Sequence, residues 1–228
     1  MCHRPFGGIG GAAMRAINLG PWPGNPKYCR GCFAALYRSR AGAETDCALL
    51  FADVRNSTTL AEGMRPSEFR QLLDRFYQTA FSILVAHDAF VDKFVGDEVI
   101  GIFLPSLTDG PPAGEAVRAG LELLTATGGG DEQRTVPIGI GVNAGIAYVG
   151  AVGTDEHVEF TALGDIVNVT ARLSAAAQAG ELLVTVEAMA EAGLSLDGLE
   201  PRDLALKGKT SRTRVVVMRD DAPLSGRP

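Results

Sequence analysis

The stretch VDKFVGDEVIGIF, residues 91–103, consists of two apolar runs on either side of a Gly-Asp turn. Val, Ile and Phe favour strands and Gly-Asp favours a turn, so the stretch predicts a β-hairpin with Asp97 at its tip. A second buried strand is predicted at CALLFADV (47–54), which carries Asp53 near its C-terminal end. If the two strands are neighbours, the two carboxylates converge on one point.

Asp53 and Asp97 together point to hard-cation chemistry. Two carboxylates with no histidine nearby suit Mg²⁺ or Mn²⁺, which prefer oxygen ligands. Such ions usually share their coordination with substrate phosphates, so the pair leads to a phosphoryl-transfer hypothesis. Taken singly, each aspartate is better explained by the frequency of Asp in turns.

The rest of the chain alternates helical and strand-like patterns. Helices are predicted after Pro66, at about 113–127 and at 166–179, and a loop at 128–133. Strand-like segments are TVPIGIGVNAG (135–145), IAYVGAVG (146–153) and LLVT (182–185), followed by a short helix from Val186 and a closing hairpin ending in RVVVM (214–218). Because the order lacks the strict βα repeat of a barrel, we predict an α+β fold with helices on one face of a sheet.

The charge composition of residues 1–40 differs from that of the rest of the chain. Residues 1–40 hold six Lys or Arg and no Asp or Glu, whereas the rest carries 15 basic and 27 acidic residues. We therefore predict an irregular, basic, Gly/Pro-rich leader at 1–42, one domain at 43–220, and a disordered tail at 221–228. The acidic body argues against nucleic-acid binding. The absence of a long apolar run or a signal peptide predicts a soluble, cytoplasmic protein without a transmembrane segment.

The leader contains a C-x-x-C motif in YCRGCF, residues 28–33. Such a motif is typical of half a zinc site or of a redox pair. No second C-x-x-C or H-x-x-H follows, and the three histidines are scattered, so reduced thiols without a role are the simpler interpretation.

Asn168 and Arg172 are spaced i,i+4 in LGDIVNVTARL (163–173), so both project from one face of the predicted third helix. Their apolar neighbours would bury part of that helix. A partly buried guanidinium is costly unless it meets an anion, and its shape suits phosphate oxygens. Alone, an Asn and an Arg on a helix are usually surface residues.

The combined pattern resembles the class III nucleotidyl cyclases, the adenylate and guanylate cyclases. The resemblance covers residues 47–218 and rests on several motifs in order, which are LLFADVRNSTTLAE, VDKFVGDEVIGIF, GIGVNAGIAYVGAVG, FTALGDIVNVTARL and LKGK. It implies a ferredoxin-like, palm-type βαββαβ core with a mostly antiparallel sheet. It also implies that ATP is converted to 3′,5′-cyclic AMP and pyrophosphate with two divalent cations, Mg²⁺ or Mn²⁺.

The resemblance assigns roles to matching positions. It implies metal binding by Asp53 and Asp97, purine recognition by Lys93 and Thr161, ribose orientation by Asn168, transition-state stabilisation by Arg172, and triphosphate binding by Lys207 with Lys209 as the fallback. A lysine donor suits N1 of adenine, which is an acceptor, so ATP is favoured. Thr161 discriminates less sharply, because a hydroxyl both donates and accepts. Asn143 stands where the family often has His, and no loss of function is inferred from it.

In this family the metal aspartates and the Asn/Arg pair of one site come from opposite subunits, so the resemblance implies a homodimer with shared active sites. Three alternatives stay open at this point. The chain could be a guanylate cyclase or a non-catalytic nucleotide-binding regulatory module. VGDEV (95–99) also faintly resembles the diguanylate cyclase signature, in which VNVTAR would have no role.

Overall fold

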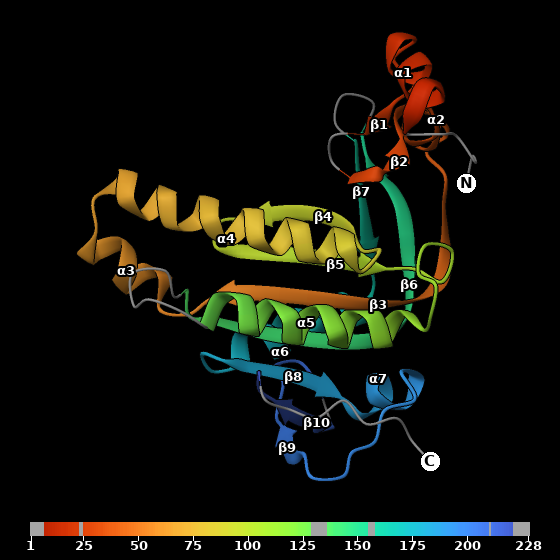
Figure 1. The fold of residues 1–228 in the computed structure, drawn as a ribbon. Coiled ribbons are helices and arrows are strands. Elements are labelled where there is room, and N and C mark those ends of the chain that lie inside the picture. Colours follow the sequence, from red (N-terminus) through yellow and green to blue (C-terminus); the bar gives the residue numbers. More distant parts are fainter. Residues whose placement is uncertain (1–6, 23–24, 129–135, 155–157, 210, 221–228) are drawn as a thin grey trace. The chain divides into compact units, whose positions relative to one another are not determined.

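The computed structural model describes residues 7–22, 25–128, 136–154, 158–209 and 211–220 (Figure 1). Its helices are α1 (Gly8–Ala16), α2 (Arg30–Ser39), α3 (Ser57–Gly63), α4 (Pro66–Ala86), α5 (Pro112–Gly128), α6 (Asp165–Ala176) and α7 (Val186–Glu191). Its strands are β1 (Pro21–Trp22), β2 (Asn25–Cys29), β3 (Gly42–Val54), β4 (Phe90–Val95), β5 (Glu98–Phe103), β6 (Ile138–Gly153), β7 (Val158–Leu163), β8 (Glu181–Thr185), β9 (Glu200–Leu204) and β10 (Thr213–Met218). The disordered tail predicted at 221–228 lies outside the described residues.

The chain forms two compact units. The smaller comprises residues 1–45 and 148–163, and the larger comprises residues 46–147 and 164–228. The larger unit contains most of the main sheet, in which the strands follow the order β4-β5-β3-β6-β8-β10-β9. Strands β6 and β8 pair in parallel, whereas β3–β5, β4–β5, β8–β10 and β9–β10 pair antiparallel. The predicted α+β class with a mostly antiparallel sheet is confirmed.

Helices α4 and α5 lie side by side over one face of the larger unit's sheet (Figure 1). Helix α4 buries the stripe Leu72, Phe76, Ala80, Ile83 and Leu84, which recurs at helical spacing. The stripe belongs to the same core cluster as strand residues such as Leu50 and Leu182. Burial of this apolar layer stabilises the packing of α4 on the β4–β5 hairpin, which pairs with β3.

Helix α6 covers the opposite face of the sheet. The prediction had helices on one face only and did not include this second layer. Val169 and Leu173 of α6 cluster with Leu183 of β8, while the next residues along β8, Leu182 and Val184, face the other core. Strand β8 is buried along its whole length, so alternation of polarity could not reveal the second layer. At Gly141 a Cβ would lie 2.5 Å from the Ser174 backbone nitrogen, so glycine lets α6 pack directly on β6.

The predicted elements are mostly present, with changes at their limits. The hairpin, the helices at 66–86 and 112–128, strand β8, helix α7 and the closing hairpin were all predicted. The segments 135–145 and 146–153 are one strand, β6, which runs through Gly145 at φ +156°. Strand β7 and helix α3 were not predicted, because segments of six and seven residues are too short to show a clear periodicity. The predicted loop at 128–133 lies mostly outside the described residues.

The smaller unit is more ordered than the irregular leader predicted from its composition. It contains α1, the β1–β2 pair and α2, together with β7 paired to the end of β6. Aromatic packing stabilises it: the Trp22 and Phe33 rings stack with centroids 3.8 Å apart, and Phe33 lies 6.1 Å from Phe160 of β7. These partners are distant in sequence, which is why the Gly/Pro content alone suggested an irregular segment.

Within the described part of the chain, no helix combines the length and apolar character that crossing a membrane requires.

Candidate active site

The end of β3 and the β4–β5 hairpin meet at one edge of the larger unit. Asp53 is directly opposite Glu98 in the β3–β5 register, and the Val54 backbone N–H donates to the Asp97 carbonyl at 3.1 Å. Gly96 forms the turn at φ +61°, a conformation that suits glycine. The Tyr77 hydroxyl of α4 donates to the Gly96 carbonyl, so α4 holds the hairpin tip. The predicted convergence of Asp53 and Asp97 is therefore present.

The pKa values of two carboxyl groups at this edge, Asp53 and Glu98, are raised. Burial raises the pKa of Asp53 to about 6; Arg55 opposes the increase and the nearby Asp97 carboxylate adds to it. Burial raises the pKa of Glu98 to about 7, and Asp53 and Asp97 raise it further. Like charges held together in a partly dry site disfavour further negative charge. A bound cation would relieve this repulsion.

Glu98 and Arg55 were not predicted as site residues. Glu98 is the first residue of β5 and is half-buried. The Arg55 guanidinium forms an ion pair with the Asp53 carboxylate, and its Nη1 donates to the Ala175 carbonyl at 3.2 Å. Arg55 thus ties the end of β3 to the last turn of α6. Its position two residues after Asp53 was the only signal in the sequence.

The residues at this edge fit a hard divalent cation. Asp53 and Asp97 offer carboxylate oxygens, the ligands that Mg²⁺ and Mn²⁺ prefer. Among the described residues, no three His, Cys, Asp or Glu side chains are placed to hold a metal ion as a group. Mg²⁺ commonly takes one or two carboxylates and completes its shell with water and phosphate oxygens, so two aspartates suffice.

The second group of predicted residues lies on α6 and the loop that follows β9. Asn168 is exposed and Arg172 half-buried, and a Cβ at Gly208 would lie 3.5 Å from Nη2 of Arg172. The Lys209 ammonium pairs with Asp165 at the start of α6, whereas the Lys207 side chain is exposed. The loop thus places Gly208, the residue after Lys207, beside Arg172, while Lys209 is engaged by Asp165 of α6.

The two predicted purine-reading residues lie in different units. Lys93 of β4 is half-buried and falls where the β4–β5 register gains an extra residue between Val91 and Phe94, a β-bulge. Thr161 lies on β7, opposite Gly150 of β6, in the smaller unit. The structure brings Asp53 and Asp97 together. Within the residues it describes, Asn168 and Arg172 form no hydrogen bond with either aspartate.

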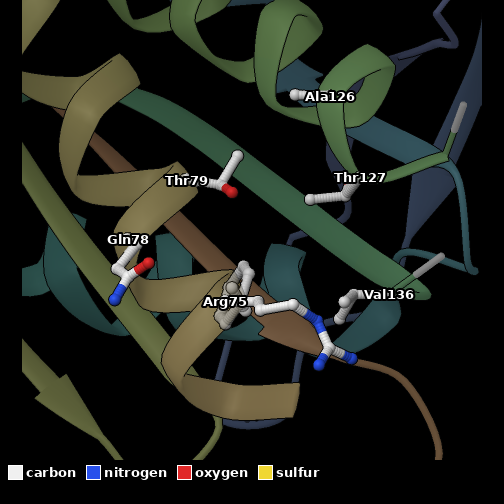
Figure 2. Close-up of a pocket in the computed structure, with 7 residues that line it drawn as sticks. Arg75, Gln78, Thr79, Ala126, Thr127 and Val136 are labelled. Atoms are coloured by element: carbon white, nitrogen blue, oxygen red, sulfur yellow. The ribbon is translucent and has the colours of Figure 1, made fainter. Parts of the chain in front are cut away.

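Two hollows lie elsewhere on the larger unit. One of about 380 Å³ lies between α4 and the end of α5, where Arg75, Gln78, Thr79 and Thr127 surround it (Figure 2). The other, of about 490 Å³, is lined by residues of α7, β9 and β10 and of the segment that connects α7 to β9. None of the lining residues is a predicted site residue, so neither hollow is the substrate site predicted here.

Comparison with known families identifies the chain. Residues 40–218 match the model of the adenylate and guanylate cyclase catalytic domain. The chain belongs to this family. Adenylate cyclase 1 of Rhizobium meliloti (strain 1021) is 30% identical over 150 residues, which cover 63% of this chain and 23% of that protein. The terminal-differentiation-specific adenylate cyclase of Dictyostelium discoideum is 28% identical over 176 residues, 73% of this chain and 8% of that protein. The chain therefore spans about a quarter or less of these relatives.

Solved structures agree with the family. The adenylyl cyclase CyaB from P. aeruginosa superposes with a TM-score of 0.69 at 26% identity, covering 82% of this chain and all of that one. The guanylyl cyclase Cya2 superposes with a TM-score of 0.68 at 22% identity, covering 81% and 98% of the two chains. An adenylyl and a guanylyl cyclase thus share this fold. A preference for adenine or guanine must therefore be inferred from individual residues.

Proposed function

We propose that this cyclase-family chain is an adenylate cyclase that converts ATP to 3′,5′-cyclic AMP and pyrophosphate. The observation that carries the proposal is the convergence of Asp53 and Asp97 at one sheet edge, where the pKa of Asp53 is raised to about 6 and that of Glu98 to about 7. Carboxylates that repel one another in a partly buried site are suited to a divalent cation bound with a triphosphate. The domain that performs the reaction spans 43–220.

Asp53 and Asp97 bind two Mg²⁺ or Mn²⁺ ions. When bound, these ions lower the pKa of the ribose 3′-hydroxyl and neutralise the triphosphate. Arg55 holds the Asp53 carboxylate in place through its ion pair and its bond to the Ala175 carbonyl. Tyr77 fixes the hairpin that carries Asp97. Pre-positioned ligands reduce the reorganisation needed when the substrate binds.

Residues of α6 and the following loop act on the sugar and phosphates. Asn168 orients the ribose, and Arg172 stabilises the charge that develops on the α-phosphate. Neither side chain makes a hydrogen bond or ion pair within the described part of the protein, so both are available to a ligand. Lys207, exposed beside Gly208, binds the triphosphate, while Lys209 is held by Asp165.

The base preference rests on Lys93. Its ammonium donates hydrogen bonds only, which matches the N1 acceptor of adenine and opposes the N1–H of guanine. The β-bulge at this position directs the side chain differently from a regular strand. Thr161 accepts or donates as the base requires. Similarity to guanylyl cyclases keeps cyclic GMP formation as the second candidate, and an acceptor at position 93 would have favoured it.

The active sites are shared in a homodimer, each with the aspartates of one subunit and Asn168 and Arg172 of the other. Mixing an Asp53→Asn variant with an Arg172→Ala variant therefore restores one intact site per mixed dimer. Random exchange gives about a quarter of wild-type activity. No recovery after verified subunit exchange would exclude shared sites.

The deciding assay measures cyclic nucleotide formation from ATP and from GTP, with Mg²⁺ and with Mn²⁺. We expect cyclic AMP, and a loss on the order of 10³-fold in Asp97→Asn. Asp203→Asn is the matched control, because Asp203 lies on β9 with its side chain 44% exposed and pairs at the surface with Arg214.

Three other results are decisive. Faster formation of cyclic GMP would select the guanylate cyclase. Nucleotide binding without product, in folded dimeric protein, would select the non-catalytic module. Equal loss in both variants would show that the aspartate at the hairpin tip has no special role.

A further inference from the structure

The C-x-x-C motif in the smaller unit has no place in the cyclase reaction. Cys29 ends β2 and Cys32 lies in the first turn of α2. Residues at i and i+3 around a helix start lie on the same side, so the two thiols are neighbours. Both are present as thiols, with Cys29 buried and Cys32 partly exposed. An accessible thiol that can attack a disulfide, with a second thiol beside it to resolve the mixed disulfide, suits thiol–disulfide exchange.

A backbone contact joins the pair. The Cys32 backbone N–H donates to Sγ of Cys29 at 3.2 Å, so the sulfur occupies the place of a helix N-cap acceptor. The positive end of α2 stabilises negative charge on sulfur during exchange. Arg30, between the two cysteines, donates from Nη1 to Oδ1 of Asn18 at 2.8 Å and from Nε to the Pro21 carbonyl. These bonds tie the start of α2 to the turn after α1 and to β1.

Cys47 provides a contrast within the same chain. It is fully buried in β3, and burial, with contributions from Glu191 and Asp46, raises the pKa of its thiol to about 12. A thiol that is buried and not ionised reacts slowly with disulfides. The difference separates a structural cysteine from a pair placed at the surface of a helix start.

We propose that Cys29 and Cys32 form a reversible redox site that exchanges with small-molecule disulfides of the glutathione type. The Cys32 thiolate attacks one sulfur of the disulfide R–S–S–R, forms a mixed disulfide and releases RS⁻. The Cys29 thiolate then attacks Sγ of Cys32 and releases the second RS⁻, closing the Cys29–Cys32 bond. The two protons lost by the cysteines convert both RS⁻ to RSH, and the two electrons lost by the cysteines reduce the original disulfide.

Oxidation of Cys29 and Cys32 changes the packing of α2 against β7. Phe33, next to Cys32 in the sequence, stacks on Trp22 and contacts Phe160, whose neighbour on β7 is Thr161. Closing the disulfide changes the first turn of α2 and so moves the ring that packs on Phe160. This consequence rests on the proposed purine-reading role of Thr161, whereas the redox chemistry of the pair does not.

The test uses the full chain with Cys2→Ser, which removes the remaining thiol of the leader. Folded protein is equilibrated with mixtures of reduced and oxidised glutathione, quenched with acid, alkylated and weighed by mass spectrometry. We expect reversible loss of two alkylation sites, mapped to Cys29 and Cys32, with Cys47 unchanged. Cys29→Ser should instead accumulate a stable glutathione adduct on Cys32. Serine preserves the N-cap acceptor, so this variant is expected to fold.

The opposite results are equally definite. Both thiols remaining alkylatable under fully oxidising conditions would overturn the proposal. So would one tightly bound zinc ion per chain or per dimer, released when either cysteine is replaced, because that would make the motif half of a metal site. Separate adducts on both cysteines without a bond between them would also refute it.

The coupling to β7 is measured separately as the ratio of KM values for ATP between oxidised and reduced enzyme. We expect a change that disappears in Cys32→Ser while kcat in the reduced state is unaffected. An unchanged KM with a disulfide demonstrated by mass would reject the coupling alone. Absence of any cyclase activity would reject the proposed function and leave the mass result standing.

Discussion

Two carboxylate clusters in the larger unit are opposite in their electrostatics. At the β3–β5 edge, Asp53 and Glu98 have pKa values raised to about 6 and about 7. At the far end of the sheet, hydrogen bonding to Arg202 is the main cause that lowers the pKa of Glu181, although its side chain is only 4% exposed. Both clusters are partly buried, so burial alone does not explain the difference.

The number of arginine partners explains it. Glu181 accepts from Nη1 of Arg202 at 2.9 Å and from Nη2 of Arg219 at 3.0 Å, so its charge is compensated. Burial and nearby carboxylates instead raise the pKa of Asp53 and of Glu98, and Arg55 is the counter-charge that opposes the increase at both. The Glu181 cluster is therefore neutralised by the protein's own arginines, whereas a bound cation would neutralise the Asp53 cluster. The predictions below test this contrast, beginning with the largest effect.

Replacing Asp53 by Asn should separate activity from stability. Cyclic nucleotide formation should fall on the order of 10³-fold, because a metal ligand is lost. The melting temperature in the absence of metal should stay the same or rise, because a carboxyl group that resists ionisation becomes neutral. Parallel assays and thermal melts in a chelator decide the matter. Strong destabilisation would mean that the ion pair with Arg55 outweighs carboxylate repulsion.

Replacing Glu181 by Gln should have the reverse outcome. It leaves Arg202 with a weakened partner in a partly buried site and should cost about 3 kcal/mol of unfolding free energy. Activity per folded molecule should be unchanged, since none of the proposed site residues contacts Glu181. Urea unfolding followed by circular dichroism measures the first quantity. A variant as stable as wild type would show that the cluster is not a stabilising one.

The pH dependence of stability should differ between the clusters. A carboxyl group with a raised pKa binds its proton more tightly in the folded state, so metal-free stability falls as pH rises from about 4 to about 7. The pKa of Glu181 is lowered in the folded state, so its carboxylate stabilises the protein at pH values above its unfolded-state pKa. This stabilisation is lost as pH falls through the folded-state pKa. We expect Mg²⁺ to raise the melting temperature more at pH 8 than at pH 5. Equal effects at both pH values would contradict the raised pKa values.

The smallest effect is expected at Glu200. Its carboxylate pairs with Arg202 and Arg219, but its side chain is 48% exposed. Solvent screens such pairs, so Glu200→Gln should lower the melting temperature far less than Glu181→Gln. Differential scanning calorimetry of the two variants, which remove the same charge from the same cluster, isolates the effect of burial. A larger effect at Glu200 would reverse the proposed order.

The sequence by itself determined the elements that carry strong local signals. The apolar runs around Gly96 and Asp97 and the run ending at Asp53 predicted two strands whose ends meet, and the structure places them in one register. Helix α4 was predicted from its 3.6-residue repeat. These features depend on residues close together in the chain, so their physics is visible without the fold.

The tertiary structure alone decided the features that depend on distant partners. Glu98 is a site residue because it pairs opposite Asp53, and Arg55 because α6 ends beside it. Helix α6 covers the second face of a strand that is apolar on both sides. The order in the smaller unit comes from Phe33 packing between Trp22 and Phe160, three residues that lie far apart in the chain. In each case the deciding free energy belongs to a contact that local sequence patterns do not contain.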